Sequence, residues 1–156
     1  MPLEHELGLK KPLAIPSHEA LLNIYYTSTG LRKQVTEFLR PFGLTDVQFN
    51  VLMLLKHQSG AEEGLSQARI SEMMLVNRAN ITSLIDRMEK AGSVKRTAAD
   101  DRRYNIIKMT VKGKKLLAKV EPLYARKVKK VMACLGKTEQ KRLVSLLEKI
   151  RERIAE

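Results

Sequence analysis

The sequence predicts a mainly α-helical fold that carries one small β hairpin. Two observations predict this fold class: apolar residues recur every three or four positions through most of the chain, whereas strict alternation is confined to residues 104–109. The chain has 156 residues, with 8 Gly and 5 Pro. This length suffices for a compact domain with its own hydrophobic core, and the composition is typical of a globular protein.

The N-terminal segment, residues 1–16, is expected to be an extended arm, because three prolines interrupt it. We expect the first helix to begin near Ser17, a favourable N-cap, and to run to about Phe42. Gly43 is expected to end it, since glycine is the common residue just past a helix C-terminus.

Two short helices are expected next. Thr45 and Gln48 match the capping-box pattern, which predicts a second helix that ends at Gly60. Ser66 is the expected N-cap of a brief third helix. Leu65, just before it, is expected to form a very short strand.

A fourth helix is expected from Arg78 to Ala91, where Gly92 ends it. Asn77 is its expected N-cap. Its apolar residues form one stripe at helical spacing: Ile81, Leu84, Ile85 and Met88. This stripe would bury one face of the helix and leave the opposite face polar.

A β hairpin follows, formed by residues 93–97 and 104–109 and joined by a charged loop. Thr110 is the expected N-cap of a long fifth helix. Thr138 is the expected N-cap of a sixth, whose apolar stripe extends to Ile154. The expected order is four helices, one hairpin and two helices.

Two short helices followed by a hairpin describe a winged helix-turn-helix, whose second helix can lie in the DNA major groove. The candidate contacts on and beside the fourth helix are Asn77, Arg78, Asn80, Thr82, Ser83 and Arg87. Asn can pair with adenine, Arg with guanine or phosphate, and hydroxyl groups take either role. The same residues would also fit the solvated face of an ordinary surface helix.

The hairpin is basic, which favours the DNA-binding interpretation over a merely solvated run of charge. Lys95 and Arg96 lie on its first strand. Arg102 and Arg103 lie at its tip, where a guanidinium can enter the minor groove. Asp101 is expected to orient a neighbouring arginine through a bidentate ion pair.

The formal net charge is +12, with 29 basic and 17 acidic residues, and all of the excess lies in residues 93–156. A balance of this sign favours a polyanionic partner, with nucleic acid ahead of an acidic membrane. Residues 61–92, which contain the fourth helix, carry a net charge of −1. This helix is therefore expected to read bases rather than to supply charge.

Residues 77–113 resemble the recognition helix, the wing and the wing exit of MarR-type transcription regulators. The family pattern is an Asp-x-Arg wing tip, then a Leu-Thr step, then a Gly three residues after the Thr. The matching residues are Asp101, Arg103, Thr110 and Gly113. Met109 replaces the usual Leu, and Ser93 and Tyr104 also depart from the pattern.

The resemblance implies a homodimer in which each subunit presents one winged helix to a pseudo-palindromic site on double-stranded DNA. It implies a helical dimerisation region at residues 17–44 and 110–156, and a DNA-binding region at residues 45–109. Arg103 would be the minor-groove arginine and Asp101 its anchor. Most members repress transcription, and many release DNA when a small, often aromatic, effector binds.

Other function classes receive less support from the residues. There is no phosphate-binding Gly loop, no nucleophile with a nearby base motif and no cluster with metal-ligand spacing, so no enzyme, metal or other cofactor is expected. The single cysteine, Cys134, is expected to be an inert buried thiol. Without a signal peptide or a long apolar run, the chain is expected to be cytoplasmic. The remaining alternative is a helical protein-interaction module with a basic surface and no specific DNA site.

Overall fold

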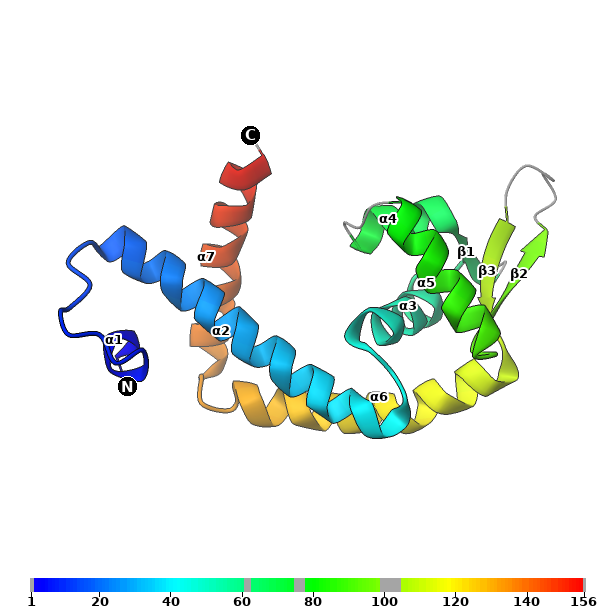
Figure 1. Ribbon diagram of the computed structural model, residues 1–156, viewed down its shortest axis with the longest axis horizontal. Helices are drawn as coiled ribbons and strands as arrows, with labels where there is room; N and C mark the ends of the chain where they lie inside the picture. The colour runs from blue at the N-terminus through cyan, green and yellow to red at the C-terminus, as the bar shows by residue number, and fades with distance from the viewer. Residues whose placement is uncertain (1, 61–62, 75–77, 99–104, 156) are drawn as a thin grey trace. The chain divides into compact units, whose positions relative to one another are not determined.

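Figure 1 shows the computed structural model of the chain, which describes residues 2–60, 63–74, 78–98 and 105–155. The helices are α1 (Leu3–Glu6), α2 (Pro16–Leu39), α3 (Asp46–His57), α4 (Gln67–Met74), α5 (Arg78–Lys90), α6 (Val111–Met132) and α7 (Lys137–Ala155), and a 3₁₀ turn occupies Arg40–Phe42. The strands are β1 (Gly64–Ser66), β2 (Val94–Ala98) and β3 (Asn105–Met109). The predicted mainly α-helical fold with a small β wing is confirmed.

The chain divides into two compact units, Met1–Gly113 and Lys114–Glu156. The first unit contains α1 to α5, the sheet and the first residues of α6. The second unit contains the remainder of α6 and all of α7. The winged helix-turn-helix, which consists of α3 to α5 and the sheet, therefore lies within one unit.

Local hydrogen bonds fix the starts of α3 and α4. The Gln48 N–H donates to Thr45 Oγ1 at 3.3 Å, and the Thr45 N–H donates to Gln48 Oε1 at 3.0 Å. These two bonds complete the predicted capping box of α3. At α4, the Arg69 N–H donates to Ser66 Oγ at 3.2 Å, which confirms the predicted cap.

Three expectations, one about the N-terminal arm and two about helix caps, are wrong. The arm expected to be extended contains the short helix α1, so there are seven helices among the described residues rather than six. Pro2 occupies the N-cap position of α1, and the helix buries Leu3, whose transfer from water offsets part of the cost of ordering the turn. Helices α2 and α7 begin ahead of the expected caps Ser17 and Thr138. Pro16 occupies the first position of α2. The N–H at that position has no partner within a helix, so the N–H that proline lacks is not needed there.

The three strands form one antiparallel sheet in the order β1-β3-β2. The hairpin of β2 and β3 is confirmed, and the very short strand expected at Leu65 is β1, which pairs with β3. Gly64 permits the close approach of these strands, because a Cβ at this position would lie 2.7 Å from the Ile107 carbonyl oxygen. Strand β2 lies at the edge of the sheet, where every second backbone N–H group points away from the ladder.

The core of the winged helix-turn-helix is built by α3, α4, α5 and the sheet. The apolar stripe of α5 is buried as predicted: Ile81, Leu84, Ile85 and Met88. Neighbouring elements contribute further buried side chains, which include Phe49, Leu52, Ile70, Val94 and Ile107. Because the stripe faces this core, the opposite face of α5 is turned to solvent.

The end of α5 is bonded to the start of α6. Gly92 has a φ of +75°, a left-handed conformation that glycine adopts readily after a helix. Thr110 Oγ1 donates to the Gly92 carbonyl oxygen at 2.6 Å and accepts from the Gly113 N–H at 3.1 Å. Lys112 Nζ donates to the Ala91 carbonyl oxygen at 2.6 Å. Thr110 and Gly113, which match the family pattern, therefore set how the chain leaves the wing.

Cys134 is exposed, so the expectation of a buried thiol is wrong. It lies in the turn between α6 and α7, where its Sγ donates to the Val131 carbonyl oxygen at 3.4 Å. Gln140 Nε2 holds this turn by donating to the carbonyl oxygens of Met132 at 3.1 Å and Leu135 at 2.9 Å. The apolar neighbours suggest burial only if the helix continues, and α6 ends at Met132.

Candidate nucleic-acid interface

The exposed face of α5 carries most of the predicted base-reading residues. Four of their side chains are exposed there: Asn80, Thr82, Ser83 and Arg87. Arg78 begins α5, but its side chain and the whole of Asn77 lie outside the described part of the chain. The exposed groups are amide, hydroxyl and guanidinium groups, which are the donors and acceptors used in major-groove recognition.

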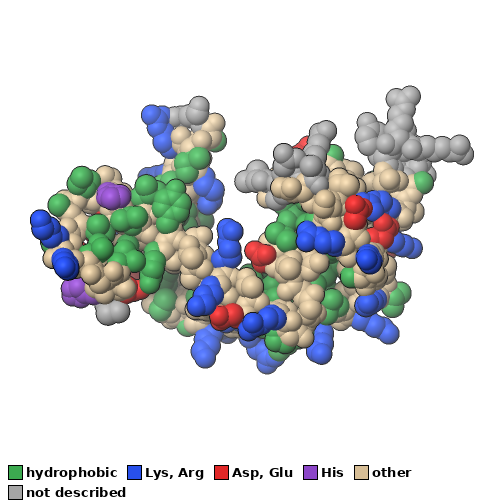
Figure 2. Space-filling model, in the orientation of Figure 1, with side chains coloured by type: hydrophobic (Ala, Val, Ile, Leu, Met, Phe, Trp, Pro, Cys, Tyr) green, Lys and Arg blue, Asp and Glu red, His purple; other side chains and the backbone are tan. Residues whose placement is uncertain are grey.

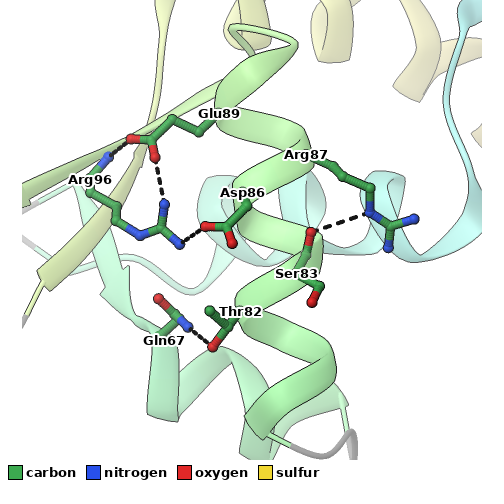
Figure 3. Close-up of polar contacts among 7 residues, drawn as sticks. All are labelled: Gln67, Thr82, Ser83, Asp86, Arg87, Glu89 and Arg96. Carbon is green, nitrogen blue, oxygen red and sulfur yellow. Dashed lines mark hydrogen bonds and ion pairs between the residues drawn. The ribbon is translucent and has the colours of Figure 1, made fainter.

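A hydrogen bond joins the two helices of the helix-turn-helix on this face. Gln67 Nε2, at the first position of α4, donates to Thr82 Oγ1 at 2.8 Å (Figure 3). The bond orients the Thr82 hydroxyl and links the start of α4 to the reading face of α5. Gln67 is not among the residues that the sequence predicts for the site, because the two residues are 15 positions apart and no local pattern connects them.

Arg87 is oriented by its own helix. Its Nε donates to the Ser83 carbonyl oxygen at 3.2 Å, one helical turn earlier. Figure 3 shows the guanidinium on the side of α5 away from Arg96, with its two terminal nitrogens beyond the helix backbone. An arginine held in this way presents two N–H-bearing nitrogens that suit a phosphate or a guanine edge.

Arg96 of β2 is held by two carboxylates of α5 (Figure 3). Its Nη1 lies 2.5 Å from Glu89 Oε2, and its Nη2 lies 2.5 Å from Asp86 Oδ1. The backbone N–H of Arg96 donates to the other Glu89 oxygen, Oε1, at 2.8 Å. The Arg96 side chain is 22% exposed. We call Asp86, Glu89 and Arg96 the helix–wing clasp, since they join α5 to the wing.

The clasp shifts two ionisation equilibria. The Arg96 N–H, followed by the Arg96 guanidinium, stabilises the carboxylate and holds the pKa of Glu89 below its ordinary value of 4.5. Burial acts to lower the pKa of Arg96, but hydrogen bonds to Asp86 and Glu89 outweigh burial and raise that pKa. Glu89 and Arg96 are therefore both charged at neutral pH.

Lys95 and Arg96 lie on opposite faces of β2, because successive strand residues alternate. Lys95 is exposed and is paired in register with Lys108 of β3. Arg96 is paired in register with the buried Ile107 and is bound by α5. Two residues expected to act alike therefore have different surroundings. The other wing candidates, Asp101, Arg102 and Arg103, lie outside the described residues.

Asp86 and Glu89 are likewise not among the site residues that the sequence predicts. They are three positions apart on α5 and so share one side of the helix. That spacing indicates that the two carboxylates lie side by side on the helix. Their partner, however, lies on a strand, and local sequence patterns do not show which strand residue faces a helix.

The described residues contain no group of three or more His, Cys, Asp or Glu side chains placed to hold a metal ion. Among the described helices, none has the length and apolar character needed to cross a bilayer. The polar contacts of the candidate interface come from α4, α5 and β2.

Known proteins are similar in sequence to this chain. A family model described as MarR family matches residues 42–103, from the end of the 3₁₀ turn into the wing. The chain is 31% identical over 133 residues to the HTH-type transcriptional regulator PrsX of Escherichia coli. This alignment covers 83% of this chain and 79% of PrsX. It is 27% identical over 140 residues to the HTH-type transcriptional repressor YetL of Bacillus subtilis, with 89% of this chain and 83% of YetL covered.

Solved structures share the fold. AbsC, a MarR family transcriptional regulator from Streptomyces coelicolor, matches with a TM-score of 0.81 at 21% identity, over 93% of this chain and 99% of AbsC. The transcriptional regulator MosR of M. tuberculosis, solved in complex with DNA, matches with a TM-score of 0.68 at 25% identity, over 86% of this chain and 97% of MosR.

Proposed function

The chain belongs to the MarR family of transcriptional regulators, and from this premise we propose that it is a homodimeric repressor that binds a pseudo-palindromic site on double-stranded DNA. The observation that carries the proposal is the exposed polar face of α5, which lies beside a basic wing and opposite a fully buried apolar stripe. A helix of this kind can enter the major groove while its other face stays in the core.

In the proposal, α5 reads base edges. Asn80 is suited to pair with adenine, and Arg78 and Arg87 are suited to guanine or phosphate. Thr82 and Ser83 supply hydroxyl groups, and Gln67 orients the first of these. The N-terminus of α5, where we place Asn77, offers backbone N–H groups to a phosphate.

In the proposal, the wing supplies contacts to the DNA backbone and the minor groove. The exposed ammonium group of Lys95 would contact phosphate. Arg103 would enter the minor groove, oriented by Asp101, and Arg102 would contact the flanking backbone. These contacts fix register and orientation, while α5 determines the sequence.

Dimerisation is supported by helix α7. None of its 19 residues, all of which the structure describes, is buried. Its exposed apolar residues recur at helical spacing and are Leu143, Val144, Leu146, Ile150 and Ile154. An amphipathic helix gains most of its stability by packing its apolar face, so α7 needs a partner.

Helix α2 presents a second apolar surface. Figure 2 shows hydrophobic side chains gathered over its N-terminal half, where Leu21, Tyr25 and Tyr26 are all more than 40% exposed. We assign residues 17–44 and 110–156 to the dimerisation region, and residues 45–109 to the DNA-binding region. A dimer of this kind would present two copies of α5 to two half-sites.

The repressor role is supported by the relative YetL, which is named as a transcriptional repressor. We propose that a small effector, aromatic in character, releases the protein from DNA. Addition of a panel of aromatic ligands to the protein–DNA complex tests this part of the proposal. One of them is expected to lower DNA affinity, and the loss of affinity must saturate with ligand concentration.

Selection of bound sequences from a random double-stranded pool tests the proposed function. The expected result is enrichment of an inverted repeat whose half-sites are about 10 base pairs apart, or a multiple of that spacing. If no sequence is enriched and binding depends only on salt, the proposal fails. The basic surface would then belong to a protein-interaction module or to a nonspecific binder.

A further inference from the structure

We propose that Arg96 is a positioning residue that holds the wing at a fixed place beside α5, and that it acts through Asp86 and Glu89 rather than by touching DNA. The inference rests on the proposed DNA-binding function and deepens it, because it assigns three charged residues to the geometry of the interface. It also changes the role expected for Arg96, which the sequence groups with the other basic wing residues.

The clasp uses both terminal nitrogens of the guanidinium. Glu89 Oε2 binds Nη1 and Asp86 Oδ1 binds Nη2, each at a distance of 2.5 Å. The two carboxylates lie one helical turn apart on α5, so they match the fixed fork of an arginine. A lysine has a single ammonium nitrogen on a flexible stem and cannot reproduce this arrangement.

Glu89 binds the backbone of the wing as well as its side chain. Its Oε1 accepts from the Arg96 N–H at 2.8 Å, while its Oε2 accepts from the guanidinium. Strand β2 is the edge of the sheet, so its outward N–H groups have no neighbouring strand. The carboxylate of Glu89 therefore occupies the place of a missing strand and ties the edge of the wing to the helix.

The side chain of Arg96 points toward α5. Its register partner across the ladder is Ile107, which is fully buried, whereas the neighbouring pair Lys95 and Lys108 lies on the opposite face. The Arg96 side chain is more than three-quarters buried. A side chain placed in this way can set the distance between α5 and the wing, but it presents little of its charge to a polyanion.

If the clasp positions the wing, removing its negative charges should change DNA affinity in the direction opposite to that expected from electrostatic repulsion alone. Asp86 and Glu89 are negative charges on the DNA-facing helix, so neutralising them should strengthen binding to phosphates if they do nothing else. If they position the wing, neutralising them should weaken binding to the operator, because α5 and the wing must enter two different grooves together.

The decisive comparison uses the full-length protein and the operator obtained by sequence selection. The double variant Asp86→Asn/Glu89→Gln keeps the size of both side chains and removes both charges. Glu72→Gln is the matched control, since the pair that Glu72 makes with Arg69 at 3.1 Å lies within a single helix, α4. We expect about a tenfold loss of operator affinity for the double variant, the size of one good base contact, and no loss for the control. Equal or tighter operator binding by the double variant overturns the inference.

Arg96→Lys separates positioning from direct contact. A phosphate contact would survive this change, because the positive charge remains. Positioning requires the fork, so Arg96→Lys should lose about as much operator affinity as Arg96→Ala, again about tenfold. The triple variant Arg96→Ala/Asp86→Asn/Glu89→Gln should bind no more weakly than Arg96→Ala alone, because the three residues act as one unit. Wild-type affinity for Arg96→Lys would contradict the proposal.

Amide hydrogen exchange tests the clasp independently of DNA. The Arg96 N–H should exchange at least tenfold faster in Asp86→Asn/Glu89→Gln than in the wild type, while the amides of α3 remain protected. Unchanged exchange at Arg96 overturns the inference even if the proposed function holds. Conversely, a wild-type protein that selects no DNA sequence overturns the proposed function, and the exchange result still decides whether the clasp holds the wing.

Discussion

Lys95 and Lys108 lie directly opposite each other in the antiparallel ladder of β2 and β3. Like charges at directly opposed positions of an antiparallel pair repel, so this pair costs folding free energy. A phosphate backbone placed against this face would offset the repulsion. The pairing therefore indicates a surface that is better suited to a polyanion than to isolation in solvent.

Replacing Lys108 by Thr should affect folding and DNA binding in opposite directions. Loss of the repulsion is expected to raise the free energy of unfolding by about 0.2–1 kcal/mol. DNA binding should weaken alike for all sequences. The slope of log affinity against log salt concentration should fall by about 0.9 for each subunit, or about 1.8 for the proposed dimer, because each subunit neutralises one phosphate fewer. Urea unfolding and DNA titration at several salt concentrations measure the two effects. A loss confined to the operator would show that Lys108 reads sequence instead.

Gly113→Ala should destabilise the joint between the wing and α6. A Cβ at Gly113 would collide with the Ser93 carbonyl oxygen, which is backbone and cannot move aside cheaply. We expect a loss of about 1–3 kcal/mol in the free energy of unfolding. Gly30→Ala is the control, because Gly30 lies in α2 with nothing within 4 Å of the added Cβ. That change should raise stability by about 0.5–1 kcal/mol. Equal effects of the two substitutions would refute the packing argument.

The decrease in the free energy of unfolding at acid pH should depend on Glu89. Its pKa in the folded chain lies below the ordinary 4.5, so its contribution is fully present above the unfolded-state pKa and is lost as the pH falls through the folded value. We expect the free energy of unfolding to fall less steeply below about pH 4.5 in Glu89→Gln than in the wild type. Urea titrations from about pH 3 to pH 6 measure this difference. Parallel curves for the two proteins would mean that Glu89 contributes nothing.

The apolar stripe of α7 should control the oligomeric state. Leu146→Arg places a charge in the middle of this stripe and should raise the dimer dissociation constant at least tenfold, since a buried charge without a partner is costly. Gln58→Arg is the control, because Gln58 is exposed at the C-terminal end of α3, outside the region assigned to dimerisation. Sedimentation velocity distinguishes dimer from monomer. A dimer that survives Leu146→Arg places the subunit contact elsewhere.

Local patterns predict much of this fold, and long-range contacts account for what they miss. The capping box at Thr45 and the buried stripe of α5 depend on residues within one or two turns, so the sequence predicts both. The clasp joins a helix to a strand, and the bond from Gln67 to Thr82 joins two helices. Neither has a periodic signature. Arg96 shows the difference most clearly, because its charge suggests DNA contact and its surroundings suggest an internal anchor.

If α5 reads a DNA sequence, the protein must discriminate between the selected operator and a scrambled site, and the ratio of its affinities for the two sites measures this discrimination. At physiological salt the wild type should bind the operator at least about 10³-fold more tightly. Asn80→Ala should reduce the corresponding difference in binding free energy by about 1–3 kcal/mol while leaving binding to the scrambled site unchanged. A ratio near one for the wild type, or a ratio unchanged by Asn80→Ala, would show that α5 does not read the sequence.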